Sequence, residues 1–175
     1  LTIFIIVAII NSINFIDGID GLAILIVAKF IILVELFANS DLGVTYLSLI
    51  VLFSTLPLLY FNFKKKEKIF LGDAGSHFLG GVVSILVLYV LSQDYLIKPQ
   101  FDINKILFIL SILSYPIFDI IRVSSIRVLN GKSPFVADKN HIHHIILKKL
   151  GNHLYTSLMI LILSFVFTIL MQLIF

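Results

Sequence analysis

Long apolar runs, most of them close to the length that a helix needs to cross a lipid bilayer, occupy most of this chain. A crossing takes about 20 residues, because a helix rises ~1.5 Å per residue and the hydrocarbon layer is ~30 Å thick. The runs lie at 1–10, 22–38, 44–61, 75–91, 103–121 and 154–175. Only 13% of the residues are charged, against about a quarter in soluble domains, and mean hydropathy is +1.11. We therefore expect an all-α, polytopic transmembrane helical bundle with about five full spans plus a truncated first helix.

The chain starts at Leu1, inside an apolar run and without the basic stretch that would mark a signal peptide. We expect residues 1–175 to form one integral membrane domain, and we expect further sequence upstream of Leu1. The lack of cysteine excludes disulfides and thiolate chemistry. The hydropathy excludes a soluble binding module, and no nucleic-acid partner is expected.

Three polar segments, at 11–21, 62–76 and 122–153, are separated from one another by two apolar runs each. Two crossings return the chain to the side on which it started, so all three segments are predicted to lie on one side of the membrane. That side carries ten Lys and Arg residues, whereas the other carries only Lys98 and Lys105. This excess predicts that the three segments face the cytoplasm.

The first polar segment contains Asn11, Asn14, Asp17 and Asp20 at intervals of three residues. At a helix end this spacing brings successive side chains within about 5–6 Å of one another. Two carboxylates that close repel each other unless a cation or a donor lies between them. Their hard oxygen atoms favour Mg²⁺, which keeps waters and substrate phosphates in its shell. The alternative is a polar turn that caps two helices.

The second polar segment leads into Ile69–Gly81, where a single carboxylate, Asp73, lies among small residues at a predicted helix start. Small residues let other groups approach the backbone closely. A helix start adds free N–H groups and a dipole that favours anions. This pattern predicts a site for a metal ion that carries phosphates, and the alternative is that Asp73 only caps the helix.

The third polar segment contains His141, His143 and His144, which follow Asp138 in a basic stretch. Histidine clusters suggest a transition metal first. However, the chain has no cysteine, and its carboxylates favour Mg²⁺, so imidazoles that donate hydrogen bonds to phosphates are a further option. The alternative is an interfacial loop whose histidines have no special role.

Other conspicuous residues are interpreted as structural. Lys29 lies in the middle of an apolar run, with Glu35 six residues further on, and the two are not on one helical face. Ionisable residues within spans are functional candidates, but helix packing or snorkelling is the interpretation that we favour for Lys29. His77 and His153 lack neighbouring histidines, and Pro116 predicts a kink in its run.

Four stretches together resemble the motifs of the polyprenyl-phosphate N-acetylhexosamine-1-phosphate transferases. They are Asn11–Leu22, Phe70–Ser76, Pro116–Asp119 and Ser133–His144, and they occur in the family's order. The His-x-His-His form resembles the N-acetylglucosamine branch, whereas the muramoyl-pentapeptide branch favours three consecutive histidines. The chain resembles the C-terminal portion of the family. An aspartate pair that the family carries further upstream is not in this sequence, so we expect residues 1–175 alone to be inactive.

The resemblance implies an integral membrane enzyme that transfers N-acetylhexosamine 1-phosphate, in this branch N-acetylglucosamine 1-phosphate. The implied donor is a UDP-N-acetylhexosamine and the implied acceptor is polyprenyl phosphate, such as undecaprenyl phosphate. UMP would be released, and the product would start a lipid-linked cell-envelope glycan. The implied cofactor is Mg²⁺, with Mn²⁺ as the alternative. The implied location is the bacterial cytoplasmic membrane with the active site facing the cytoplasm, and a homodimer is left open.

Position by position, the resemblance implies that Asp73 is the metal ligand. The catalytic residues that it implies are Asp17, Asp20, His141, His143 and His144. The substrate-binding residues that it implies are Asn11, Asn14, Asn62, Phe70 and Asp138, with Phe70 stacking on uracil.

Two other function classes compete with the transferase. A cation or proton transporter would use acids and histidines across the depth of the membrane, whereas here they gather in the three polar segments. An inactive membrane fragment or scaffold would share the fold, and the sequence upstream of Leu1 would distinguish it from the enzyme.

The topology can be tested with single cysteines in place of Lys65, Lys98 and Lys139. Because the first and third positions lie in the basic segments, we expect an impermeant thiol reagent added to intact cells to label only position 98. Labelling of position 65 or 139 but not of position 98 would contradict the predicted orientation.

Overall fold

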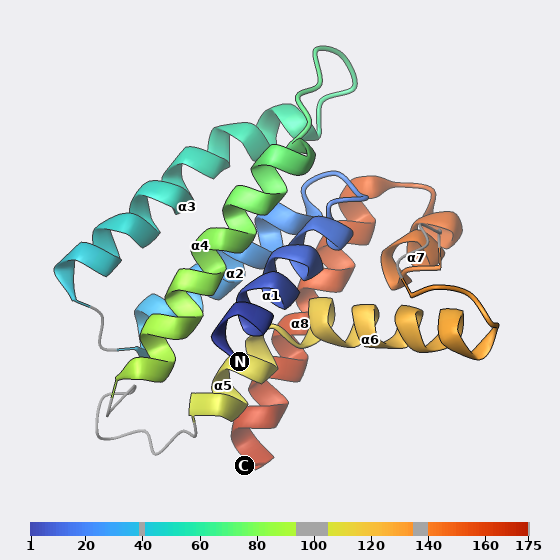
Figure 1. Ribbon diagram of the computed structural model, residues 1–175. Coiled ribbons are helices and arrows are strands. Elements are labelled where there is room, and N and C mark those ends of the chain that lie inside the picture. Colours follow the sequence, from blue (N-terminus) through green and yellow to red (C-terminus); the bar gives the residue numbers. More distant parts are fainter. Residues whose placement is uncertain (39–40, 94–104, 135–139, 175) are drawn as a thin grey trace.

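The computed structural model describes residues 1–38, 41–93, 105–134 and 140–174, and within these ranges it consists of helices joined by short connections (Figure 1). The eight helices are α1 (Thr2–Ile16), α2 (Leu22–Phe37), α3 (Leu42–Asn62), α4 (Gly72–Ser92), α5 (Lys105–Ile112), α6 (Ser114–Leu129), α7 (Ile142–Leu150) and α8 (His153–Ile174). The expected all-α bundle is confirmed. Asp138, Lys98 and Lys139 lie outside the described residues.

Three of these helices, α3, α4 and α8, are long and apolar enough to cross a membrane. The helices α1 and α2 are shorter, with 15 and 16 residues. The run 103–121, expected as one span, instead contains two helices, α5 and α6, which meet at Leu113 with a bend of 70°. Counting this bent pair as one span brings the number of described candidates to four.

The bend lies three residues before Pro116, as expected for a proline kink. Proline has no N–H and its ring crowds the carbonyl four residues earlier, which is that of Ile112. The ammonium of Lys29, which is only 2% exposed, donates a hydrogen bond of 2.8 Å to the Ile112 carbonyl. Lys29 is therefore a buried packing partner of the bend, and Glu35 instead accepts a hydrogen bond from Thr45.

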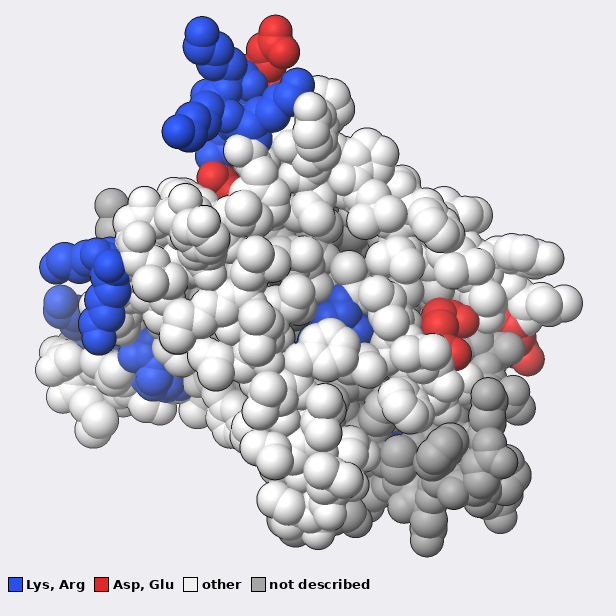
Figure 2. All heavy atoms as spheres, turned by 180° about the vertical axis from the view of Figure 1, so that it is seen from behind, with Lys and Arg blue, Asp and Glu red and all other residues white. Residues whose placement is uncertain are grey.

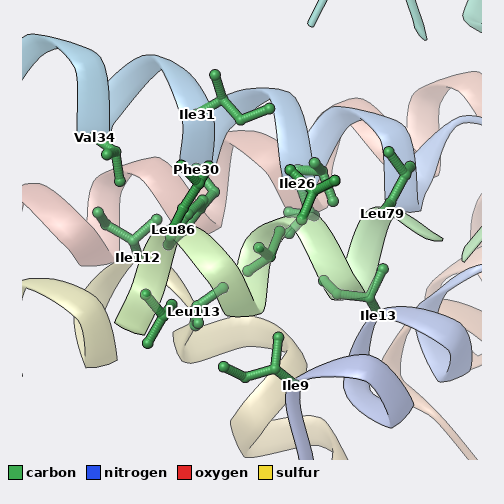
Figure 3. Close-up of a cluster of buried hydrophobic side chains, with 14 of the residues drawn as sticks. Ile9, Ile13, Ile26, Phe30, Ile31, Val34, Leu79, Leu86, Ile112 and Leu113 are labelled. Carbon is green, nitrogen blue, oxygen red and sulfur yellow. The ribbon is translucent and has the colours of Figure 1, made fainter. Parts of the chain in front are cut away.

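The core lies between α1, α2 and α4, with α5 and α8 closing it (Figure 1). Figure 3 shows side chains such as Ile13, Phe30 and Leu86 pointing toward one another from the first three of these helices. By contrast, α3 packs mainly on α2 and exposes large apolar side chains such as Tyr46 and Phe53. An apolar outer face of this kind suits a helix that contacts lipid.

A glycine sets the distance between α1 and α4, the two helices that carry the first two polar motifs. A Cβ added to Gly80 would lie 2.7 Å from the Cα of Ile10, so α4 approaches the backbone of α1 directly at this point. Nothing lies within 4 Å of a Cβ added to the neighbouring Gly81. Small residues at such crossings are typical of helix pairs in membranes.

The three polar segments meet at one end of the bundle, where the turn after α1, the loop after α3 and the start of α8 lie together (Figure 1). The Asn62 side chain accepts a hydrogen bond from the Gly21 N–H, and Ser157 donates to the Asp20 carbonyl at 2.7 Å. The three segments therefore share one end of the bundle, as the count of apolar runs predicted. Figure 2 shows lysines and arginines gathered on the loop between α3 and α4 and near α6 and α7.

Substituting Gly80 by alanine is predicted to separate α1 from α4. Because the new methyl group meets backbone atoms that cannot rotate away, we expect Gly80→Ala to lower the free energy of unfolding by about 1–3 kcal/mol. The matched control is Gly81→Ala, whose methyl group enters open space and improves helix propensity. Thermal unfolding in detergent should show a lower melting temperature for the first variant only. Equal melting temperatures would contradict the close approach at Gly80.

Candidate active site

Asn14 ties the end of α1 to the start of α4. Its side-chain amide donates to Asp73 Oδ1 at 3.2 Å and to Ser76 Oγ at 2.8 Å. Asp73 lies in the first turn of α4, but the N-cap residue is Leu71, with no side-chain cap hydrogen bond. The alternative that Asp73 only caps this helix is therefore wrong, and its exposed carboxylate is available for another role.

Asp17, which ends α1, lies close enough to two other carboxylates to interact with them. Partial burial, followed by the negative charges of Asp73 and Asp20, raises the pKa of Asp17 to about 7. A hydrogen bond from the Gly72 N–H opposes this rise. Three carboxylates from two different motifs thus converge at the same end of the bundle, as expected from the count of apolar runs between them.

Asp20 has partners of its own. Lys68 Nζ lies 2.6 Å from Asp20 Oδ2, and His153 Nδ1 lies 3.1 Å from the same oxygen. The turn that carries Asp20 is anchored by the buried Asn62, whose amide also donates to the Ile69 carbonyl at 2.8 Å. Asn62 therefore holds the turn after α1 against the loop that precedes α4.

Phe70 lies at the open edge of this group. Its side chain is 68% exposed, and Lys68 Nζ lies 4.8 Å from the centre of its ring. The same ammonium thus faces both an aromatic ring and a carboxylate, Asp20. Asn11 lies apart from these contacts, because its exposed amide donates to the Val7 carbonyl one turn earlier in α1.

A second group of contacts holds the histidines, and it centres on Asp119 of α6. Asp119 Oδ2 lies 2.9 Å from His141 Nδ1, and Asp119 Oδ1 accepts the Ile142 N–H at 3.0 Å. Arg122 Nη2 donates to Asp119 at 2.9 Å and also bonds the Asn140 carbonyl. One buried carboxylate therefore orients the start of the histidine segment.

His143 is fully buried, and its Nδ1 lies 3.0 Å from the Tyr115 hydroxyl of α6. Burial, followed by the neighbouring His144, lowers the pKa of His143 to about 3, so its ring is neutral at physiological pH. Its Nε2 has no hydrogen-bond partner among the described residues. The His143 and His144 rings lie 4.4 Å apart, centre to centre.

Gly18 joins the carboxylate group to the histidine group. A Cβ added to this residue would lie 3.0 Å from His143 Nε2 and 3.2 Å from His144 Nε2, so the glycine is what lets the two imidazoles reach the turn after α1. The Phe15 and His141 rings also face each other at 5.8 Å. The first and third polar motifs, more than 100 residues apart in the chain, are thus in direct contact.

The carboxylates are the residues that could hold a metal ion. Among the described residues there is no group of three or more His, Cys, Asp or Glu side chains placed to hold one. Mg²⁺ commonly uses only one or two protein carboxylates and takes its other ligands from water and phosphates. Asp73 and Asp17 fit that requirement, since both bear hard oxygens and the charge of Asp73 acts on Asp17.

Sequence reasoning missed Lys68, Tyr115, Arg122 and His153 as contacts within this site, and it placed Asp119 in a motif without foreseeing its contact with His141. His153, expected to be structural, lies beside Asp20. Its position at the junction between a polar segment and an apolar run is the sequence feature that could have indicated a place in the site. Asp119 stands out in the sequence as a carboxylate inside an apolar run.

Taken together, the fold and the site define a polytopic membrane protein with carboxylates and histidines converging at one end of its bundle. Residues 1–91, more than half of the chain, match the family model described as glycosyl transferase family 4. The chain therefore belongs to that family.

Curated relatives extend this similarity over nearly the whole chain. It is 37% identical, over 97% of its length and 46% of the relative, to a Bacillus subtilis (strain 168) protein named "Probable undecaprenyl-phosphate N-acetylglucosaminyl 1-phosphate transferase". It is 30% identical, over 85% of the chain and 40% of the relative, to "Undecaprenyl-phosphate alpha-N-acetylglucosaminyl 1-phosphate transferase" of Escherichia coli (strain K12). A Mycobacterium leprae (strain TN) protein, "Decaprenyl-phosphate N-acetylglucosaminephosphotransferase", is 32% identical over 85% of the chain and 41% of the relative. The chain spans less than half the length of these relatives.

The environment of His143 can be tested by NMR of protein carrying labelled histidines. Because burial lowers its pKa to about 3, the His143 ring signals should not shift between pH 5 and pH 8, whereas an ordinary histidine, with a pKa of about 6.5, titrates in that range. Loss of one set of signals in His143→Gln assigns the resonance. A titration midpoint above pH 6 for that resonance would contradict the buried, neutral ring.

Proposed function

We propose that the protein containing this chain transfers N-acetylglucosamine 1-phosphate from UDP-N-acetylglucosamine to undecaprenyl phosphate and releases UMP. The names of the relatives support both the sugar and the lipid acceptor. The observation that carries the proposal is the contact of the histidines with Gly18, which places them beside the converging carboxylates at one end of an apolar bundle. Such a site suits a lipid substrate whose phosphate lies at the membrane surface.

In the proposed reaction an oxygen of the lipid phosphate attacks the phosphorus that bears the sugar. The bond from that phosphorus to the bridging oxygen of the UDP-sugar breaks, and UMP leaves with that oxygen. The product is a polyprenyl pyrophosphate that carries N-acetylglucosamine. Phosphoryl transfers of this kind depend on positioning and on neutralising charge more than on covalent catalysis.

Asp73, with Asp17 beside it, is proposed to hold Mg²⁺ or Mn²⁺. Such an ion, when bound, neutralises phosphate charge and aligns the reacting groups. Asn14 keeps Asp73 oriented through its hydrogen bond to Oδ1. The carboxylate of Asp20, already paired with Lys68, is proposed to accept hydrogen bonds from the nucleotide and not to act as a free base.

The remaining residues are assigned either to the uracil ring of the UDP-sugar or to phosphate oxygens. The exposed ring of Phe70 offers a face on which uracil can stack, and Asn62 positions the turn next to it. His141, His143 and His144 are proposed to donate hydrogen bonds to phosphate oxygens, because the Asp119 and Tyr115 contacts fix the orientation of the first two rings. Asn11 and Asp138 are kept as substrate-binding candidates from the family pattern alone.

The same reasoning proposes an orientation in the bacterial cytoplasmic membrane. Lysines and arginines gather on the loop between α3 and α4 and near α6 and α7 (Figure 2), and two of them, Lys68 and Arg122, contact the candidate site. Basic residues are enriched on the cytoplasmic side of membrane proteins. The site would therefore face the cytosol, where UDP-sugars and Mg²⁺ are available.

The decisive substitution is Asp73→Asn, assayed in membranes that express the intact gene. Asparagine keeps the shape of aspartate but loses the charge that would hold the metal ion against two phosphates. Losing one preorganised electrostatic group typically costs ~10²–10³ in rate, and we expect at least that loss in UMP release from UDP-N-acetylglucosamine and undecaprenyl phosphate.

Asp41→Asn is the matched control, because Asp41 is an exposed carboxylate at the start of another helix, α3, without a side-chain cap hydrogen bond. We expect its activity to equal that of the unsubstituted protein. Near-normal UMP release from Asp73→Asn at saturating Mg²⁺ would remove Asp73 from the metal site and overturn this part of the proposal.

A further inference from the structure

The bend between α5 and α6 leaves backbone carbonyls that the helices themselves do not satisfy. In an unbroken helix the Ile112 carbonyl would accept the N–H of residue 116, but Pro116 has none. The bend lies between apolar helices, where water cannot replace the missing donor without cost. These carbonyls therefore need side-chain donors from neighbouring helices.

Two such donors come from the neighbouring helices α2 and α8. From α2, Lys29 Nζ donates to the Ile112 carbonyl at 2.8 Å and also to the Ser164 hydroxyl of α8. From α8, the Thr168 hydroxyl lies 3.0 Å from the Ser111 carbonyl and shares its proton with the Ser164 carbonyl of its own helix, at 2.9 Å. The lysine ammonium is thus the point at which α2, α5 and α8 are joined by hydrogen bonds.

Packing alone does not explain a lysine at this position. A buried cation loses its hydration, so an apolar side chain would be preferred if the space only had to be filled. Lys29 is 2% exposed and extends between apolar neighbours, among them the Phe165 ring at 6.0 Å from its Nζ. What it provides that leucine or methionine cannot is a donor for the orphaned carbonyl.

The direction of α6 matters because this helix holds the histidine segment. It begins one residue after the bend, and within its first nine residues it carries Tyr115, Asp119 and Arg122. These three side chains contact His143, His141 and the Asn140 carbonyl, respectively. A change in the bend would therefore disturb the α6 contacts that orient the imidazoles beside Gly18.

We propose that Lys29 is a positioning residue, which holds the 70° bend through the Ile112 carbonyl and so places the histidines against the turn after α1. It touches no reacting group and acts through α6. Its effect on turnover rests on the proposed transferase function, whereas its effect on the geometry of α6 does not.

The test uses Lys29→Met in the intact gene product, reconstituted in lipid nanodiscs. Its melting temperature should fall, because the Ile112 carbonyl loses its donor, and two further readouts follow the geometry and the activity. Spin labels at the exposed positions Leu129 of α6 and Tyr155 of α8 report the direction of α6 relative to the bundle. We expect the label distance to shift or to broaden. We also expect kcat for UMP release to fall at least ~10-fold, because a misplacement of about 1 Å can cost 10²-fold in rate.

The matched control is Glu35→Gln, which changes another ionisable residue of α2 whose recorded partner, Thr45, lies on α3. It should leave both readouts unchanged. A third variant, Lys29→Met with Pro116→Ala, returns a backbone N–H to the Ile112 carbonyl. Its melting temperature should recover while the label distance and kcat do not, since the restored hydrogen bond favours a straighter helix. If Lys29 only stabilised the fold, the double variant would recover its melting temperature, label distance and kcat together.

An unchanged label distance in Lys29→Met would overturn the proposal, whatever happens to activity. If Lys29→Met does not fold, Lys29→Gln replaces it, because the glutamine amide keeps a neutral donor, and a label distance equal to that of the unsubstituted protein is then expected. A Gln variant that folds with a displaced α6 would also overturn the proposal. Absence of UMP release from the unsubstituted protein would refute the transferase proposal but leave the distance test intact.

Discussion

The hydrogen bond from Lys29 to the Ile112 carbonyl lies at the point on which the arrangement of the site depends. Lipid cannot satisfy a free backbone carbonyl, so a broken span must find its donors within the protein. Once the carbonyl is paired, α6 can turn by 70° from α5 and bring Tyr115 and Asp119 into contact with the histidines. The break would weaken an isolated membrane helix, but here it directs α6 toward the histidines, which its side chains hold in place.

In the site itself, repulsion between neighbouring carboxylates is only partly offset by nearby hydrogen-bond donors and positive charge. Asp17 lies near two other carboxylates, and its raised pKa reflects burial first and their repulsion second. Lys68 and Asn14 moderate this repulsion at Asp20 and Asp73, respectively. Asp119, by contrast, is surrounded by donors from Arg122, His141 and Ile142. The cluster of Asp17, Asp20 and Asp73 is thus short of positive charge and suits a cation. The carboxylate of Asp119 already has its hydrogen-bond donors, and it serves to orient neighbouring side chains.

Much of the fold could be predicted from hydropathy, because apolar runs of nearly 20 residues permit few structures in a membrane. The runs 22–38 and 103–121 were exceptions, because the first forms a helix of only 16 residues and the second is broken into two helices. Pro116 indicated a kink, but the bend of 70° depends on donors from α2 and α8, which no local pattern reveals. The role of Lys29 likewise could not be read from its own helix, since its partners are Ile112 and Ser164.

For the site, the sequence by itself predicted which residues could carry the chemistry and that the segments bearing them gather at one end of the bundle. Asp17, Asp20 and Asp73 lie in motifs whose residue types and spacing are informative, and counting the apolar runs is enough to bring the motifs to one end. Only the tertiary structure decided that Gly18 meets His143, that Lys68 pairs with Asp20 and that Asp119 orients His141. The physical reason is that these contacts join segments separated by 20 to more than 100 residues. Their distances depend on how closely the helices pack and on the angle at which one span is broken.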